Sequence, residues 1–290
     1  MQVWQSVTFE HPRDLLELAP VCEEAGFEGI MLADHLFAPE HFSSRYPYGE
    51  SGEAPFDGLT PFPEVFATTA ALAQVTTTLR FLVNVYVLPP RHPIEVAKDV
   101  SAAATLSENR AVLGVGAGWL REEFEIMGVP FERRGRRMDE QIPIIRRLLS
   151  GDVVETREEF YRFEALRLSP VPTEKVPLWV GGMNPAALRR AGQHGDGWWS
   201  APVTFDESIE LLGELRRQRE RFGRESDPFD CLIGLTEVLS TEQTARLAEL
   251  GMTGVTSWPL VSQLPSDCTI EEKKARIREL GETLVAPLEK

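Results

Sequence analysis

Cysteine and histidine are scarce in this sequence, and their spacing excludes several kinds of site. The three cysteines, Cys22, Cys231 and Cys268, lie far apart without a CxxC pair, which argues against a disulfide framework and against structural zinc. The five histidines include no HExxH pair, and no Gly-x-Ser-x-Gly motif is present for a nucleophilic serine. We therefore expect buried or incidental thiols and no resident metal ion.

The chain also lacks a long apolar run and an excess of basic residues. No stretch approaches the length of a membrane span, and no basic segment followed by an apolar one lies at the N-terminus. The formal net charge of -15 repels nucleic acid and anionic membrane surfaces. These features predict a cytoplasmic protein, with neither nucleic acid nor membrane as a partner.

What the sequence does contain is a repeated alternation of strand and helix. Crossover helices return the chain to the same end of a sheet, so the strands pair in parallel. The alternation predicts an α/β fold in which eight units close into one TIM barrel over residues 1–290, with an open doubly wound sheet as the competing architecture. The expected strands are 2–9, 29–33, 79–88, 111–115, 178–180, 197–200, 231–239 and 254–258, and the expected helices are 12–25, 61–75, 93–106, 135–149, 186–193, 205–222, 241–250 and 271–288.

Three segments do not fit the repeat and are expected to be insertions. They are 38–60, which is rich in Gly, Pro, Ser and aromatic residues, 119–134 after the fourth strand, and 152–176, which is long, charged and contains proline. Long segments of this kind in a compact domain are usually lids or added strands.

The carboxyl ends of the strands carry the chemistry in a barrel of this kind, and this rule selects Asp34 and His35 after the second strand. His35 can act as a general acid or base near neutral pH, or donate a hydrogen bond to a cofactor ring. The alternatives are a histidine that satisfies a buried backbone carbonyl and a metal-dependent hydrolase. A metal site would need further ligands, whereas the other strand ends offer Asn84, glycines and tryptophans.

The junction at Gly181 and Gly182 has the character of an anion site. A buried strand ends in two glycines, and Asn184 can cap a helix whose first residue is Pro185. Free N–H groups at a helix N-terminus favour a phosphate. A plain strand-to-helix turn is an equal reading of the residue types alone.

A second glycine-rich run lies at 114–118, after the fourth strand. Its glycines are too closely spaced for a dinucleotide fingerprint, which would also lie on the first strand-helix turn. We interpret it as a strand end where a flat ligand or another backbone passes close, with a tight turn before the insertion as the alternative.

These motifs together resemble the luciferase-like monooxygenase superfamily, and within it the branch that depends on the deazaflavin coenzyme F420. The resemblance spans most of the chain, and the combination of motifs is specific although each is weak alone. The matching stretches are EEAGF at 23–27, LADH at 32–35, RHP at 91–93, LGVGAGWLREEF at 113–124, GVPF at 128–131, RGRR at 134–137, VGG at 180–182 and GDGW at 195–198.

The resemblance implies a bacterial luciferase-like barrel that binds F420, with FMN as the alternative, and that holds the ring at the strand ends. It implies that His35 lies close to the reactive carbon of the ring, with Asp34 at the same site. The cofactor-binding residues implied are Asn84 and Val85, joined by a non-prolyl cis peptide, Gly116 and Gly118 beside the ring, and Gly181, Gly182 and Met183 at the phosphate.

Two departures from the sugar-phosphate dehydrogenases of this family concern the substrate. Trp119 stands where those enzymes carry a catalytic carboxylate, and their aromatic partner after the histidine has three competing matches, Phe37, Pro39 and Phe42. Both departures favour an apolar or aromatic substrate under the 38–60 segment.

The implied activity is hydride transfer between F420 and a small organic substrate, with His35 managing one proton. The alternatives are an FMN-dependent luciferase-like monooxygenase and a barrel that binds the cofactor without turnover. Similar proteins are commonly dimers, so a homodimer is expected. A basic cluster at Arg133, Arg134, Arg136 and Arg137 could meet the anionic tail of F420, or could simply be a solvated helix start.

Overall fold

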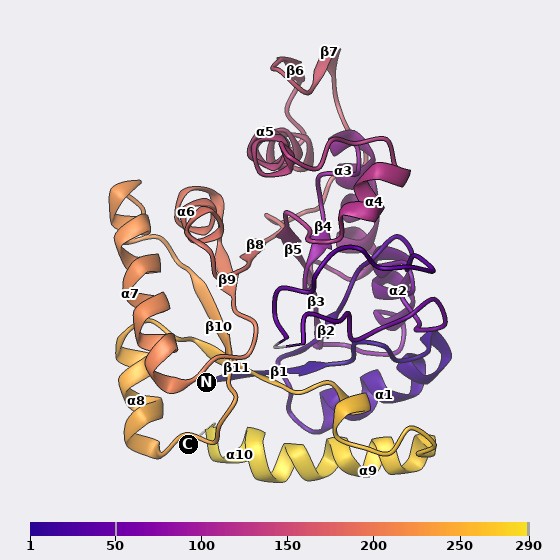
Figure 1. The fold of residues 1–290 in the computed structure, drawn as a ribbon, viewed down its shortest axis with the longest axis vertical. Coiled ribbons are helices and arrows are strands. Elements are labelled where there is room, and N and C mark those ends of the chain that lie inside the picture. The colour runs from indigo at the N-terminus through magenta and orange to yellow at the C-terminus, as the bar shows by residue number, and fades with distance from the viewer. Residues whose placement is uncertain (50, 289–290) are drawn as a thin grey trace.

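The protein is a closed parallel barrel, seen in a computed structural model that describes residues 1–49 and 51–288 (Figure 1). The sheet has nine strands in the order β3-β2-β1-β11-β10-β9-β8-β5-β4, and pairing of β3 with β5 closes it. Since β3 and β4 are two pieces of one interrupted strand, the barrel has the eight strands that the alternation predicts, and the open sheet is excluded. The barrel strands are β1 Gln2–Ser6, β2 Gly29–Leu32, β3 Arg80–Val83, β4 Tyr86–Val87, β5 Ala111–Gly116, β8 Leu178–Gly181, β9 Gly197–Trp199, β10 Asp230–Gly234 and β11 Gly254–Ser257.

Helices follow the strands and surround them, and many begin at a side-chain cap. Asn184 accepts the amide of Ala187, and Thr204, Ser240 and Thr269 each form a capping box. None of the helices in the described part of the chain is long and apolar enough to cross a membrane. The helices are α1 Pro12–Glu24, α2 Val65–Leu72, α3 Pro93–Leu106, α4 Arg121–Ile126, α5 Arg134–Leu149, α6 Pro185–His194, α7 Phe205–Arg221, α8 Thr241–Glu249, α9 Ile270–Leu280 and α10 Ala286–Leu288, with a 3-10 turn at Leu260–Ser262 and a π turn at Gly281–Val285.

Several predicted boundaries were wrong. The strand expected over 2–9 ends at Ser6, and the one expected over 231–239 ends at Gly234. The helix expected from 61 begins at Val65, because Glu64 supplies the cap by accepting the amides of Phe66 and Ala67. The helix expected over 271–288 passes into a π turn after Leu280.

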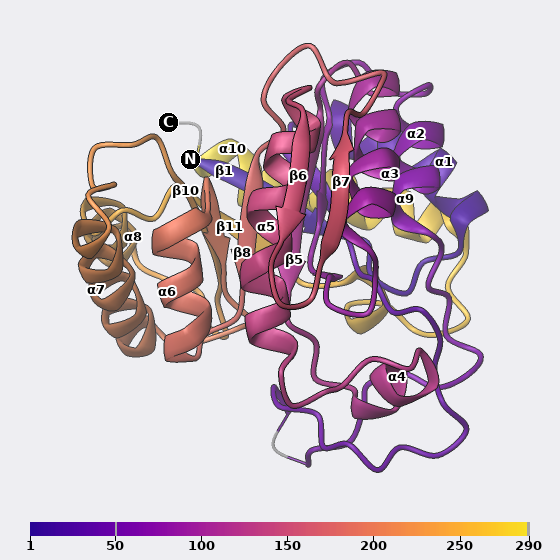
Figure 2. The same cartoon turned by 90° about the horizontal axis from the view of Figure 1, so that it is seen from above.

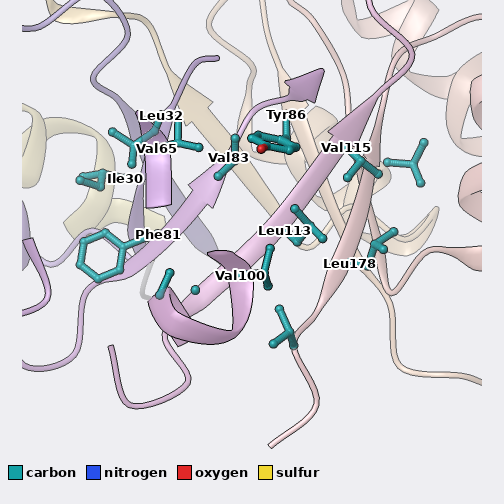
Figure 3. Packing of buried hydrophobic residues seen from close by; sticks show 14 of the residues in the cluster. Ile30, Leu32, Val65, Phe81, Val83, Tyr86, Val100, Leu113, Val115 and Leu178 are labelled. Carbon is teal, nitrogen blue, oxygen red and sulfur yellow. The ribbon is translucent and has the colours of Figure 1, made fainter. Parts of the chain in front are cut away.

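Two apolar clusters hold the barrel together. The larger one lies between strands and helices, and Figure 3 shows part of it, including Ile30 and Leu32 of β2. Met31 lies between these two residues on the strand and therefore faces the other side of the sheet, into the barrel. There it joins Trp4 and Trp179, both almost completely buried, whose ring centroids are 5.5 Å apart. The middle of the barrel is thus filled with side chains.

Two of the three expected insertions contain secondary structure. The 119–134 segment contains α4, and the 152–176 segment contains an antiparallel hairpin of β6 Val154–Arg157 and β7 Arg162–Leu166. Figure 2 shows the hairpin alongside α5, while α4 lies at one end of the molecule with the loop that follows β2. That end carries the carboxyl termini of the barrel strands.

Candidate active site at the carboxyl ends of the barrel strands

His35 lies just after β2 and is held by a carboxylate that comes from α4. Its Nδ1 atom is 3.2 Å from Oε2 of Glu123, and the Glu123 side chain is completely buried. The other Glu123 oxygen, Oε1, accepts the backbone N–H of Leu36 at 2.6 Å. One carboxylate therefore fixes both the imidazole and the backbone that follows it.

Aromatic rings surround the imidazole. The ring centroids of Phe56, Phe62 and Trp119 lie 4.9, 5.3 and 5.8 Å from that of His35. Phe9, which follows β1, is 5.4 Å from Phe62. The imidazole is thus a polar group in apolar surroundings, an environment suited to proton transfer with little competing water.

Asp34 faces a different partner from its neighbour His35. Each of its two oxygens accepts a hydrogen bond of 2.8 Å from one terminal nitrogen of Arg91. Oδ2 also accepts a hydrogen bond of 3.0 Å from the backbone N–H of Val87. Burial raises the pKa of Asp34, and the Arg91 guanidinium opposes that rise. Since protein donors already occupy both oxygens, Asp34 ties β2 to the β4 turn, and any part in cofactor binding remains a prediction.

The interruption between β3 and β4 inserts Val85 between two other strands. The Asn84–Val85 peptide bond is cis and not prolyl, as the resemblance implied. A Cβ atom at Gly116 of β5 or at Gly181 of β8 would overlap the Val85 side chain. Glycine at these two positions therefore makes room for Val85, a role that the sequence alone did not reveal.

The remaining predicted cofactor residues line the same end of the barrel. Gly118 and Gly182 have positive φ values of 79° and 113°. The Gly182 amide donates a long hydrogen bond of 3.4 Å to the Trp199 carbonyl, and Met183 follows it at the start of the α6 turn. The first N–H groups of α6 have no acceptor within the helix. Phosphate binding there remains a prediction.

Among the buried polar atoms at this end that have no partner within the described part of the chain are Oδ1 of Asn84, beside the cis peptide, and the indole Nε1 of Trp199, at the end of β9. A buried polar atom without a hydrogen bond is costly, and a bound ligand is one way to satisfy it. Within residues 1–49 and 51–288, no group of three His, Cys, Asp or Glu side chains is arranged to hold a metal ion.

The basic cluster at the start of α5 is largely engaged by the protein itself. Arg133 and Arg136 both pair with Glu159 of the β6–β7 turn. Arg134 donates from Nε to the Gly118 carbonyl at 2.9 Å, and Arg137 lies 4.5 Å above the Phe160 ring. These contacts favour a structural role in docking the hairpin.

A second carboxylate on α4 anchors the loop that follows β2. Glu122 accepts the backbone amides and the hydroxyl groups of both Ser43 and Ser44. Burial by itself raises the pKa of Glu122, but these hydrogen bonds outweigh it and lower the pKa to about 2. Glu122 and its neighbour Glu123 thus hold segment 36–44 at two points.

The sequence over residues 2–280 matches the luciferase-like monooxygenase family. The chain belongs to this family. An uncharacterized protein of Mycobacterium tuberculosis is 40% identical over 240 residues, which are 83% of each chain. An F420-dependent glucose-6-phosphate dehydrogenase of Nakamurella multipartita is 27% identical and aligns over 94% of this chain and 76% of its own. Membership makes the chain an oxidoreductase of the flavin and deazaflavin type.

Solved structures of other proteins share the barrel. The monooxygenase RslO1 of Streptomyces bottropensis superposes with a TM-score of 0.77 at 16% identity, over 99% of this chain and 100% of its own. An F420-dependent secondary alcohol dehydrogenase, solved with an F420–acetone adduct, gives a TM-score of 0.75 at 16% identity over 98% of each chain. At these identities the likeness concerns the fold.

Three residues at the site escaped the sequence reasoning. Glu123 belongs to a matching motif but was not singled out, and Phe56 and Phe62 contact His35 where Phe37, Pro39 and Phe42 were the candidates. Glu123 could have been found from its place beside the apolar Phe124, since both residues are buried in the same short helix. For the two phenylalanines, the aromatic content of 38–60 gave only a general indication.

Proposed function

We propose that this luciferase-like protein transfers a hydride between coenzyme F420 and a small apolar alcohol or carbonyl compound. The observation that carries the proposal is His35, held by Glu123 at the strand ends and enclosed by aromatic rings. The relatives named as F420-dependent dehydrogenases support the choice of cofactor.

The residues present fit a deazaflavin ring and its phosphate. The unpartnered oxygen of Asn84 offers an acceptor to a ring N–H, and the unpartnered indole N–H of Trp199 offers a donor to a ring carbonyl. The N-terminus of α6, beside Gly182 and Met183, offers amides to a phosphate. When bound, the deazaflavin supplies the carbon that gives or accepts the hydride.

His35 then handles the proton that accompanies the hydride. When an alcohol is oxidised, its C–H hydrogen leaves as hydride, and the hydroxyl proton passes to the imidazole. Reduction of a carbonyl reverses both transfers. His35 is suited to either direction because an imidazole can give or take a proton near neutral pH.

The surroundings of His35 favour an apolar substrate over a sugar phosphate. Its ring is contacted by three aromatic side chains, and its Nδ1 atom meets a carboxylate, which would repel a phosphate. Arg121, the first residue of α4, is already paired with Glu132 at 2.6 Å. An uncharged substrate with a hydrocarbon body matches these walls.

A cofactor titration tests the proposal. The purified protein is titrated with F420 and, separately, with FMN, and binding is followed by absorbance and by quenching of tryptophan fluorescence. We expect F420 to bind more tightly, and reduction of bound F420 by short secondary alcohols to be lost in His35→Ala. Tight binding of FMN without binding of F420 would instead favour the monooxygenase.

A third result would point to the binding barrel without turnover. In that case F420 would bind, but no alcohol or carbonyl compound in a broad panel would change its redox state. Hydride transfer that is unchanged in His35→Ala would remove His35 from the mechanism while leaving the cofactor assignment in place.

A further inference from the structure

We propose that Glu123 is the positioning residue of His35, and that it links the orientation of the imidazole to the docking of segment 36–44. The part that His35 plays in proton transfer rests on the proposed function. The orientation of its ring does not, because it follows from contacts within the protein.

The contact between the two side chains fixes where the imidazole carries its proton. A carboxylate oxygen accepts hydrogen bonds, so the proposal places the imidazole hydrogen on the Nδ1 atom, which is 3.2 Å from Oε2 of Glu123. The Nε2 atom lies on the opposite side of the ring and has no hydrogen-bond partner in the described residues. In the neutral ring, Nε2 is therefore the basic atom, free to meet the substrate.

The position of the Glu123 carboxylate is fixed by the residues around it. Its side chain is completely buried, and Oε1 is engaged by the Leu36 amide at 2.6 Å. The next residue, Phe124, is also buried, and its ring packs against that of Phe131 at 5.2 Å, which anchors α4. The carboxylate is thus held in place from both sides.

Adjacent residues of α4 connect this contact to the loop. Glu122 binds Ser43 and Ser44, and the Arg121 amide donates to the Ser44 hydroxyl at 2.9 Å. Since Glu122 and Glu123 share one short helix, segment 36–44 is docked and His35 is oriented by the same element. The Leu36 end of the segment is held by Glu123 itself, whereas the Ser43 and Ser44 end is held by Glu122. The second end can therefore be loosened without breaking the contact between Glu123 and His35.

The first experiment examines the wild-type protein and needs no cofactor. Protein labelled with ¹⁵N-histidine is examined by long-range ¹H–¹⁵N NMR correlation above neutral pH, and the His35 signals are assigned from their loss in His35→Gln. We expect the neutral ring to carry its hydrogen on Nδ1. A ring that carries it on Nε2 in the wild-type protein would overturn the proposal.

Variants then separate the two carboxylates. The amide of Glu123→Gln has one acceptor only, so it cannot serve both the Leu36 N–H and the imidazole, and the tautomer should shift toward Nε2–H. The kcat for hydride transfer should fall about 10–100-fold, as for other residues that orient a functional histidine, while the Kd of F420 stays unchanged. Glu123→Ala should show the same tautomer.

Glu122→Gln is the matched control, because it weakens the docking of the loop without touching His35. We expect its tautomer to be that of the wild type, its KM to rise several-fold and its kcat to stay within about twofold. An unchanged tautomer in both Glu123 variants, or equal losses of kcat in Glu122→Gln and Glu123→Gln, would refute the positioning role. If the tautomers behave as expected but no F420 turnover occurs, the proposed function fails and the positioning stands.

Discussion

The Glu23 carboxylate allows the stability of the barrel to be tested without any ligand. It lies in the last turn of α1 and accepts the backbone N–H groups of Thr77, Thr78 and Leu79, together with the Thr78 hydroxyl. These residues lead into β3, so one side chain connects α1 to a barrel strand. Burial by itself raises the pKa of Glu23, but the hydrogen bonds outweigh it and lower the pKa from 4.5 to about 2.

The direction of the pKa change determines how stability depends on pH. A carboxylate with a lower pKa in the folded protein stabilises it above the unfolded pKa, and this contribution is lost as pH falls toward the folded value. The drop from 4.5 to about 2 sets a ceiling of about 3.4 kcal/mol, at about 1.36 kcal/mol per pKa unit. Solvent screening of this half-buried group reduces the expected contribution to about 1–2 kcal/mol.

Glu23→Gln is therefore expected to lower the free energy of unfolding by about 1–2 kcal/mol at neutral pH. The difference from the wild type should shrink as pH falls from 4.5 toward about 2. Urea unfolding followed by circular dichroism across this range measures it. The control is Glu24→Gln, at an adjacent exposed residue that forms no hydrogen bond or ion pair with the described residues. Equal stability of Glu23→Gln and wild type at neutral pH, or a difference that does not change with pH, would refute the reasoning.

Three further predictions concern the site. Gly116→Ala should lower the free energy of unfolding by about 1–3 kcal/mol through overlap with Val85, and Val85→Ala in the same chain should restore most of it, as thermal melts would show. Arg91→Met should lower the free energy of unfolding by about 3–5 kcal/mol, because it leaves the buried Asp34 carboxylate without its partner. A melting temperature no lower than that of the wild type would contradict this prediction. Glu122→Gln should speed proteolytic cleavage within the 38–60 segment at neutral pH, and the wild type should approach the variant's rate as pH falls from the usual carboxyl pKa of 4.5 toward about 2.

The arrangement of elements could be predicted from the sequence, whereas their ends could not. Apolar runs and helical periodicity report burial, and burial identified all eight barrel strands. The ends depend on the neighbouring strands, which cannot be read locally. Thus β1 stops at Ser6 although the apolar pattern continues, and the strand expected over 79–88 is interrupted at Asn84.

The residues of the candidate site, too, could be predicted only in part from the sequence. His35 follows from its place after a strand and from the family motif. Its partner Glu123 lies 88 residues further along the chain, and their contact depends on how α4 docks. Phe56 and Phe62 reach His35 through the irregular 38–60 segment, whose path no periodicity describes. The glycines at 116 and 181 attracted attention as ligand contacts, but the structure shows that the Val85 side chain also requires them.

The tryptophan-filled interior of the barrel has a kinetic consequence. Trp4 and Trp179 fill the barrel below the site, so a ligand at the strand ends cannot pass through the middle of the barrel. A cofactor that rests on the strand ends would lie beneath a substrate under the 38–60 segment. Binding should therefore follow a compulsory order, with the cofactor first and the substrate second, and the substrate's product should leave before the cofactor exchanges. Product inhibition patterns at fixed cofactor concentration would reveal such an order.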